Sequence, residues 1–197
     1  ESGSRNTSHT GGAIIEAAED LKQQLADSGP PQGEAELVAE ANPEPRLQGV
    51  ARRAFAAHFV EVEVDTELGG VRPVKYVAMH DSGTIINPLT SVSQVKGGVI
   101  QGLGMALHEQ LIYDENTGIP VNPGYYGARV MTHLDAPEVE VHFIETEEAH
   151  GPFGAKAVGE PPIVPVVGAT ANAVFNAIGK RIKELPMTRD KIIGASS

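Results

Sequence analysis

The chain has 197 residues, 41% of them hydrophobic, and a formal net charge of −11 from 26 acidic and 15 basic residues. This length suits one domain with a real core or two small lobes, and so acidic a chain is a poor ligand for nucleic acid or anionic lipid. The absence of cysteine excludes disulfides, thiolate zinc sites, Cys-ligated iron–sulfur clusters and cysteine nucleophiles, and is compatible with a reducing cytoplasm.

The N-terminal segment combines small hydroxyl residues, glycine and arginine at Ser2, Gly3, Ser4 and Arg5. Ahead of a helix, such groups favour an anion-binding loop, and the alternative is a disordered terminus. Helical spacing of apolar residues predicts a helix over residues 12–27, capped by Thr10 or Ser8. Because the chain does not begin with Met, we expect a processed or recombinant chain, or a piece of a longer one.

A Pro/Gly-rich stretch from about residue 28 to 45 predicts a linker or long surface loop, with one short helix over 34–41. Alternating residues over 59–65, a turn at 66–70 and a second apolar run over 74–79 predict a β-hairpin. No apolar run approaches the roughly 20 residues of a membrane span.

Residues 91–113 are mostly apolar and predict a long, buried helix. Gly98 and Gly102 share one face of it, as do Gly97 and Gly104, so another backbone or a ligand should approach closely. Gln94 and Gln101 are seven residues apart on one face, and both amides can donate and accept hydrogen bonds. They suit a heteroaromatic ligand with polar edges; the alternative is a core helix with amides at its ends.

Further elements follow towards the C-terminus: a turn at 114–118, a third strand over 139–144, a helix over 163–179 that ends at Gly179, and a short helix capped by Thr188. The order of elements predicts an α+β fold with helices packed on mainly antiparallel strands. We expect three parts: residues 1–28 with the first loop and helix, a linker over 29–48, and a main part over 49–197.

The loop from Gly151 to Pro162 holds one carboxylate, Glu160, between Gly159 and two prolines. Gly154 and Gly159 permit close approach to a bound group, and the prolines stiffen the exit. A carboxylate among Ala, Val, Gly and Pro should be poorly solvated, which suits it to accept a proton. The alternative is a helix-start carboxylate that interacts with the helix dipole.

The other motifs give little evidence for a function. The run GLGMAL (residues 102–107) lies inside an apolar helix rather than after a strand, so it is not a dinucleotide fingerprint. The seven histidines show no metal-ligand spacing, and the contiguous His80–Asp81–Ser82 is no evidence for a triad assembled in space.

Taken together, four segments resemble the molybdopterin-binding large subunit of molybdenum hydroxylases, the xanthine dehydrogenase/aldehyde oxidoreductase family. They cover most of the chain, in the family's order: GSRNTSHTGGAIIEAAEDL, HFVEVEVDTELGGVRPVKYVAMHDSGTIINP, QVKGGVIQGLGMALHEQL, and GAKAVGEPP with the C-terminal ANAVFNAIGKRIKELPMTRDKI. The resemblance implies that the chain is the C-terminal part of that subunit and shares part of its molybdopterin-binding domain.

The resemblance also implies residue roles. Glu160 falls on the family's glutamate base for hydroxylation of an aldehyde or N-heteroaromatic carbon with water. Gln94 falls on a glutamine that hydrogen-bonds the pterin, and Ser2, Gly3, Ser4 and Arg5 fall on the loop at the metal centre and the cofactor phosphates. Gly154, Lys156 and Gly159 fall on the loop that carries the base. No residue of this chain ligates molybdenum directly, because the pterin dithiolene holds the metal.

The implied cofactor is molybdopterin, with its cytosine dinucleotide form as an option, while iron–sulfur clusters and flavin belong to partner domains or subunits. The expected partners are the remaining part of the large subunit, an iron–sulfur subunit, an optional flavin subunit and a small-molecule substrate, with self-association when the chain is alone. The alternative function is a non-catalytic assembly module of a multi-subunit oxidoreductase.

Overall fold

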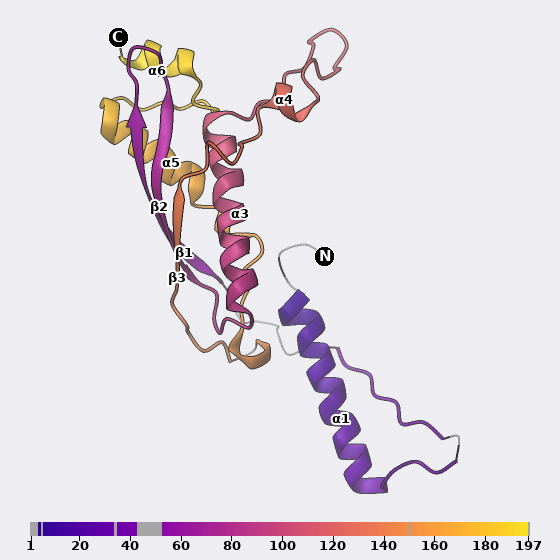
Figure 1. The fold of residues 1–197 in the computed structure, drawn as a ribbon. Coiled ribbons are helices and arrows are strands. Elements are labelled where there is room, and N and C mark those ends of the chain that lie inside the picture. The colour runs from indigo at the N-terminus through magenta and orange to yellow at the C-terminus, as the bar shows by residue number, and fades with distance from the viewer. Residues whose placement is uncertain (1–3, 5, 34, 43–52, 150, 197) are drawn as a thin grey trace.

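The computed structural model describes residues 4, 6–33, 35–42, 53–149 and 151–196 (Figure 1). The N-terminal part holds a π-helical turn η1 (Asn6–Gly11) and α1 (Gly12–Ser28), which extends away from the rest of the chain. The main part comprises β1 (Phe55–Val64), β2 (Val71–Asp81), α3 (Pro88–Leu107), α4 (Tyr125–Ala128), β3 (Glu138–Phe143), the 3₁₀ turns η2 (Pro152–Gly154) and η3 (Pro161–Ile163), α5 (Val166–Ile178) and α6 (Arg189–Ser196).

The sheet has three strands in the order β1-β2-β3. β1 and β2 form the predicted antiparallel hairpin, with Phe55 opposite Asp81 and Val64 opposite Val71. β3 pairs parallel to β2, because the connection between them contains α3 and crosses the sheet rather than turning back directly. The α+β class with a mainly antiparallel sheet is confirmed.

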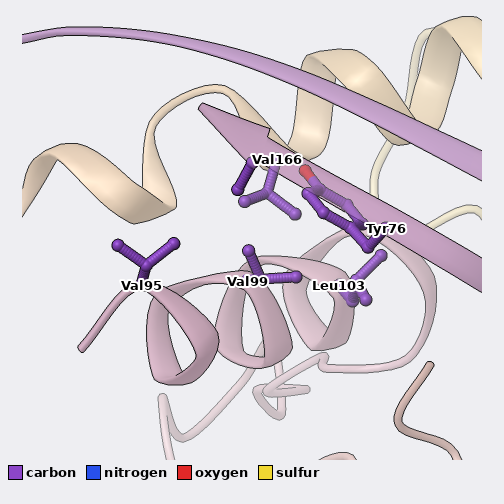
Figure 2. Close-up of a cluster of buried hydrophobic side chains, with 6 residues drawn as sticks. Tyr76, Val95, Val99, Leu103 and Val166 are labelled. Carbon is purple, nitrogen blue, oxygen red and sulfur yellow. The ribbon is translucent and has the colours of Figure 1, made fainter. Parts of the chain in front are cut away.

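The core lies between one face of the sheet and the helices α3 and α5. Burial alternates along β1 and β2, as the residue pattern predicts. Tyr76 of β2 packs with Val95, Val99 and Leu103 of α3 and with Val166 of α5, and all five are 0% exposed (Figure 2). These apolar contacts fix α3 against the segment that follows the Glu160 loop.

Glycines on α3 make this packing possible. A Cβ on Gly98 would lie 2.7 Å from Pro162 Cβ, and one on Gly102 would lie 2.5 Å from Val166 Cβ. Both distances are shorter than side-chain packing allows, so α3 approaches η3 and α5 only because these positions lack a side chain. The predicted close approach is confirmed at Gly98 and Gly102, and it is wrong at Gly97, where a Cβ would meet nothing within 4 Å.

Gly98→Ala is expected to lower the free energy of unfolding by about 1–3 kcal/mol, because the added methyl overpacks against Pro162. Gly97 is the matched control, since it lies one position away on the same helix and a Cβ there meets nothing within 4 Å. Gly97→Ala should raise stability by up to about 1 kcal/mol through helix propensity. Urea titrations of both variants check the pair, and equal stability would show that α3 and η3 do not touch as described.

The long predicted helix over 91–113 is wrong at both ends. α3 begins at Pro88, where Asn87 caps it by accepting a hydrogen bond from Thr90 N, and it ends at Leu107. The backbone N–H groups of His108 and Glu109 both donate to Gly104 O, at 2.8 and 2.7 Å, which closes the helix. Residues beyond it turn towards a short bridge between Tyr113 and Pro120.

Two smaller expectations at the N-terminal side are also wrong. α1 continues from η1 through Gly11, whose backbone is helical and which makes no side-chain cap, so neither Thr10 nor Ser8 caps a new start. Residues 35–42 contain no helix. A segment of this length is too short to form a helix that is stable without tertiary packing.

The predicted helix over 163–179 is divided into η3 and α5, and it ends at Gly179 with φ 72°, as expected. By length and composition alone, Pro161–Ile178 is apolar enough to span a bilayer, contrary to the expectation from the sequence. In this fold α5 packs against α3 and β1, and the core helix of a folded domain meets the same criterion.

Candidate functional site

Three segments that are far apart in the sequence meet at Gly159 and Glu160. The amide nitrogen Nε2 of Gln94 on α3 donates to Gly159 O at 2.6 Å. The backbone N–H of Glu160 donates to Ser4 Oγ at 2.7 Å. The structure therefore brings together the amide helix, the opening serine and the Gly–Glu turn. Ser2, Gly3 and Arg5 lie outside the described residues.

Gly159 is the point of closest contact in this arrangement. A Cβ there would lie 2.5 Å from Ser4 Oγ, so only glycine lets the opening loop sit against the turn. Pro162 is buried against Gly98 of α3 and so fixes the exit of the turn. Glu160 precedes η3, but its side chain does not cap that turn. Glu160 thus occupies the start of a helical turn without a capping hydrogen bond, and the alternative of a carboxylate that interacts with the helix dipole stays open.

Glu160 is exposed in this chain, so the expectation that it is poorly solvated is wrong for the chain by itself. Glu160 lines a cavity of about 450 Å³. This cavity is open to solvent, since two of its apolar lining residues, Phe55 and Val164, are 63% and 76% exposed. The lining comes from the start of β1 and the turn itself: Arg53, Ala54, Phe55, Ala56, Ala157, Glu160, Pro161, Val164 and Pro165.

An ion pair anchors the loop ahead of Glu160. Lys156 Nζ lies 3.0 and 2.9 Å from the two carboxylate oxygens of Asp81, and the side chains are only 13% and 16% exposed. Asp81 Oδ1 also accepts from Thr146 Oγ1 at 2.7 Å and from Gly83 N at 3.2 Å. Burial alone would raise the pKa of Asp81, but these hydrogen bonds and the ammonium charge hold it below its usual value.

Backbone hydrogen bonds join the same loop to the residues that follow β2. Lys156 N donates to Ser82 O at 2.8 Å, and Thr84 N donates to Gly154 O at 2.9 Å. Gly154 has φ +79°, a conformation that glycine adopts without strain. Gly154 and Lys156 thus tie the loop to the end of β2, and any direct contact with a cofactor stays a prediction.

Sequence reasoning missed Asp81, because His80–Asp81–Ser82 was considered only as a catalytic triad. A detectable signal was present, since Asp81 is a carboxylate at the end of a buried strand with a glycine two residues later. Such a carboxylate needs a partner when it is desolvated. Among the described residues, no group of three His, Asp or Glu side chains is arranged to hold a metal ion.

Comparisons with known proteins show which protein family this chain belongs to. A profile of the molybdopterin cofactor-binding domain family matches residues 39–137, which is 99 of the 197 residues. The molybdenum-binding subunit PaoC of the aldehyde oxidoreductase of Escherichia coli (strain K12) is 43% identical over 140 residues, covering 71% of this chain and 19% of that subunit. The putative xanthine dehydrogenase molybdenum-binding subunit XdhA of the same strain is 40% identical over 139 residues, covering 71% of this chain and 18% of the subunit.

A solved structure shows the same fold. The crystal structure of the aldehyde oxidoreductase from Desulfovibrio desulfuricans superimposes with a TM-score of 0.79 at 27% identity, over 98% of this chain and 23% of that one. The chain therefore spans about a fifth of the length of the proteins that it matches. With more than half of its residues matched by the family profile, the chain belongs to the molybdopterin cofactor-binding domain family of the xanthine dehydrogenase and aldehyde oxidoreductase type.

Proposed function

We propose that this chain forms the C-terminal wall of the molybdopterin site in a molybdenum hydroxylase and supplies Glu160 as the catalytic base. The substrate class is an aldehyde or an N-heteroaromatic compound hydroxylated with water. One observation carries the proposal: Gln94, Ser4 and the Gly159–Glu160 turn meet at hydrogen-bond distance although the partners are 65 and 156 positions apart in the sequence.

The residues present fit a pterin. Gln94 is exposed and makes one hydrogen bond to the described part of the chain, through its nitrogen, so its amide oxygen remains an acceptor for a pterin N–H group. Gly159 offers a backbone surface without a side chain beside it. The absence of cysteine agrees with a metal that is ligated by the cofactor's own dithiolene.

Each residue then has a defined task. A bound molybdopterin would supply a centre that takes two electrons from the substrate carbon. The Glu160 carboxylate accepts a proton as the oxygen of water adds to that carbon, which requires hydrogen-bond reach to the proton. The turn between Gly159 and Pro162 holds the carboxylate in place, and the Asp81–Lys156 pair holds the loop that leads into it.

The exposed apolar surface of this chain supports the proposal that other chain segments complete the site. The open cavity of Glu160 and large uncovered side chains such as Tyr126 and Leu134 would be covered by the remaining part of the large subunit. Covering the cavity would also desolvate Glu160. We infer that an iron–sulfur partner carries electrons away from the molybdenum centre and that the enzyme is cytoplasmic. The cofactor is molybdopterin or its cytosine dinucleotide form.

The molybdenum content of the assembled subunit tests this proposal. The chain is co-expressed with the remaining part of a large subunit and an iron–sulfur subunit, and metal is measured per chain. Gln94→Ala should lower the affinity for the molybdenum cofactor by roughly tenfold or more, as loss of an outer-shell partner does. Gln101→Ala is the comparison, since both amides are exposed on the same helix but, among the described contacts, it is Gln94 that hydrogen-bonds the Gly159–Glu160 turn.

The chain alone should carry far less than one molybdenum per chain. Stoichiometric metal and turnover in the isolated chain would refute the need for a partner. Equal metal content in the two glutamine variants would remove Gln94 from the site.

A further inference from the structure

A buried chain of hydrogen bonds links β1 to β2 away from the candidate site. His58 on β1 contacts two residues of β2: its Nδ1 lies 3.0 Å from Tyr76 Oη, and its Nε2 lies 2.8 Å from His80 Nε2. Tyr76 and His80 are 0% exposed, and the His58 ring meets both of their rings edge to face. No other described residue takes part in these two contacts.

The proton positions on His58, Tyr76 and His80 follow from which of their atoms donate and which accept hydrogen bonds. Two facing Nε2 atoms need one proton between them, because a neutral imidazole has one donor and one acceptor nitrogen. If His58 Nε2–H donates to His80, His58 Nδ1 is left to accept the Tyr76 hydroxyl proton. The opposite tautomer of His58 would make Tyr76 the acceptor and leave its hydroxyl proton without a partner. Each arrangement leaves one buried donor unpaired, and the first is preferred because an acidic phenol hydroxyl donates more strongly than it accepts.

The assigned arrangement puts a proton on His80 Nδ1. That atom and Ser82 Oγ are buried and have no hydrogen-bond partner among the described residues. His80 is the penultimate residue of β2, and Ser82 directly follows the strand. The shared N–H···N contact persists when one histidine is protonated, and it is lost when both histidines are cations, because both facing nitrogens are then donors.

Among the described residues, the elements packed around the two histidines offer no carboxylate to stabilise a cation. α5, which packs on β1, has no titratable residue, and Lys96 is the one titratable residue of α3 and is exposed. η3 carries none, and on β3 the residues packed towards the core are Val139, Val141 and Phe143. The charged residues of the sheet, which include Glu61, Lys75, Glu138 and Glu140, lie on its other face, and His142 lies there too. Arg53 and Glu160 line the cavity beyond the start of β1.

We propose that His58, Tyr76 and His80 form an acid-sensitive latch that holds β1 against β2 until both buried histidines are protonated. β1 is an edge strand, and its first residues form one wall of the Glu160 cavity. Ala56 of that wall pairs directly with His80. Acidification therefore loosens this wall before the hydrophobic core opens. The proposal goes beyond the assigned function and does not rest on it.

The direction of the pH effect follows from burial. Desolvation, and to a smaller extent the charge of His80, lowers the pKa of His58 to about 4, and burial lowers the pKa of His80. In the unfolded chain both histidines bind protons near pH 6.5. The unfolded state therefore takes up more protons between pH 6.5 and 4, and the stability that is present above pH 6.5 is lost as the pH falls through this window.

Nitrogen-15 NMR of the histidine rings in the full 197-residue chain tests the proton arrangement without any substitution. At pH 7.5, His58 should be protonated at Nε2 and bare at Nδ1, and His80 should be protonated at Nδ1. A proton on His58 Nδ1, or a His58 that titrates near pH 6.5, would overturn the proposal.

Urea unfolding at pH 7 and pH 5 tests the latch itself. The wild-type unfolding equilibrium constant should rise roughly tenfold between these values. His58→Gln should reduce that rise, which the remaining buried histidines then supply, while His133→Gln, which changes an exposed histidine, should leave it intact. The same rise in His58→Gln as in wild type would overturn the proposal. If His58→Gln does not fold, the NMR titration of the wild type decides alone.

Discussion

Glu160→Gln in the assembled molybdenum enzyme is expected to lower kcat by about 10²–10⁴-fold, the usual contribution of a general base. Glutamine has nearly the same shape but cannot accept the proton. Because the backbone N–H of Glu160 makes the contact to Ser4, the substitution leaves the turn and its hydrogen bond in place. Molybdenum content should therefore be unchanged, and steady-state turnover of an aldehyde or purine with an artificial electron acceptor measures the effect.

Glu147→Gln is the matched control for this loss. Glu147 is an exposed carboxylate ahead of the same loop, so its removal changes the charge by the same amount without touching the turn. Activity should then stay within about twofold of wild type, since surface substitutions away from a site have small effects. Unchanged turnover in Glu160→Gln with full metal content would end the assignment of the base and favour the non-catalytic module.

Asp81→Asn is expected to lower the free energy of unfolding by about 3 kcal/mol, at the lower end of the cost of breaking a buried ion pair. The amide keeps the size of the side chain but leaves the Lys156 ammonium, 13% exposed, without a counter-charge. Urea titration at pH 7 measures the change. Since the pKa of Asp81 is held low, its contribution should be present above about pH 4 and be lost as the pH falls through its folded pKa.

Two controls separate burial from charge in this prediction. The exposed pair Glu63–Arg72 lies on the same sheet with side chains 64% and 66% exposed, so Glu63→Gln should cost less than about 1 kcal/mol. Adding Lys156→Met to Asp81→Asn should recover much of the lost stability, because no buried charge is then unpaired. Equal costs for Asp81→Asn and Glu63→Gln would show that the Asp81–Lys156 pair is solvated.

The local elements could be predicted because local patterns determine them. Alternation gave β1 and β2, the turn between them and their pairing. Glycine spacing on α3 predicted the close approach that Gly98 and Gly102 make. Gly179 ended α5 because the left-handed backbone there favours glycine. Each of these features is indicated by a pattern of residues within one short segment, even where the contacting partner lies elsewhere in the chain.

The tertiary structure alone decided how these elements meet. Side-chain periodicity carries no information on strand direction, so the parallel pairing of β3 appeared only with the crossover through α3. The same holds for the exposure of Glu160, the Asp81–Lys156 pair and the contact between His58 and His80. Sequence by itself indicated candidate residues for the chemistry and the glycines that permit close packing. The contacts that surround these residues join positions 22 to 156 apart in the sequence, and only the folded chain brings those together.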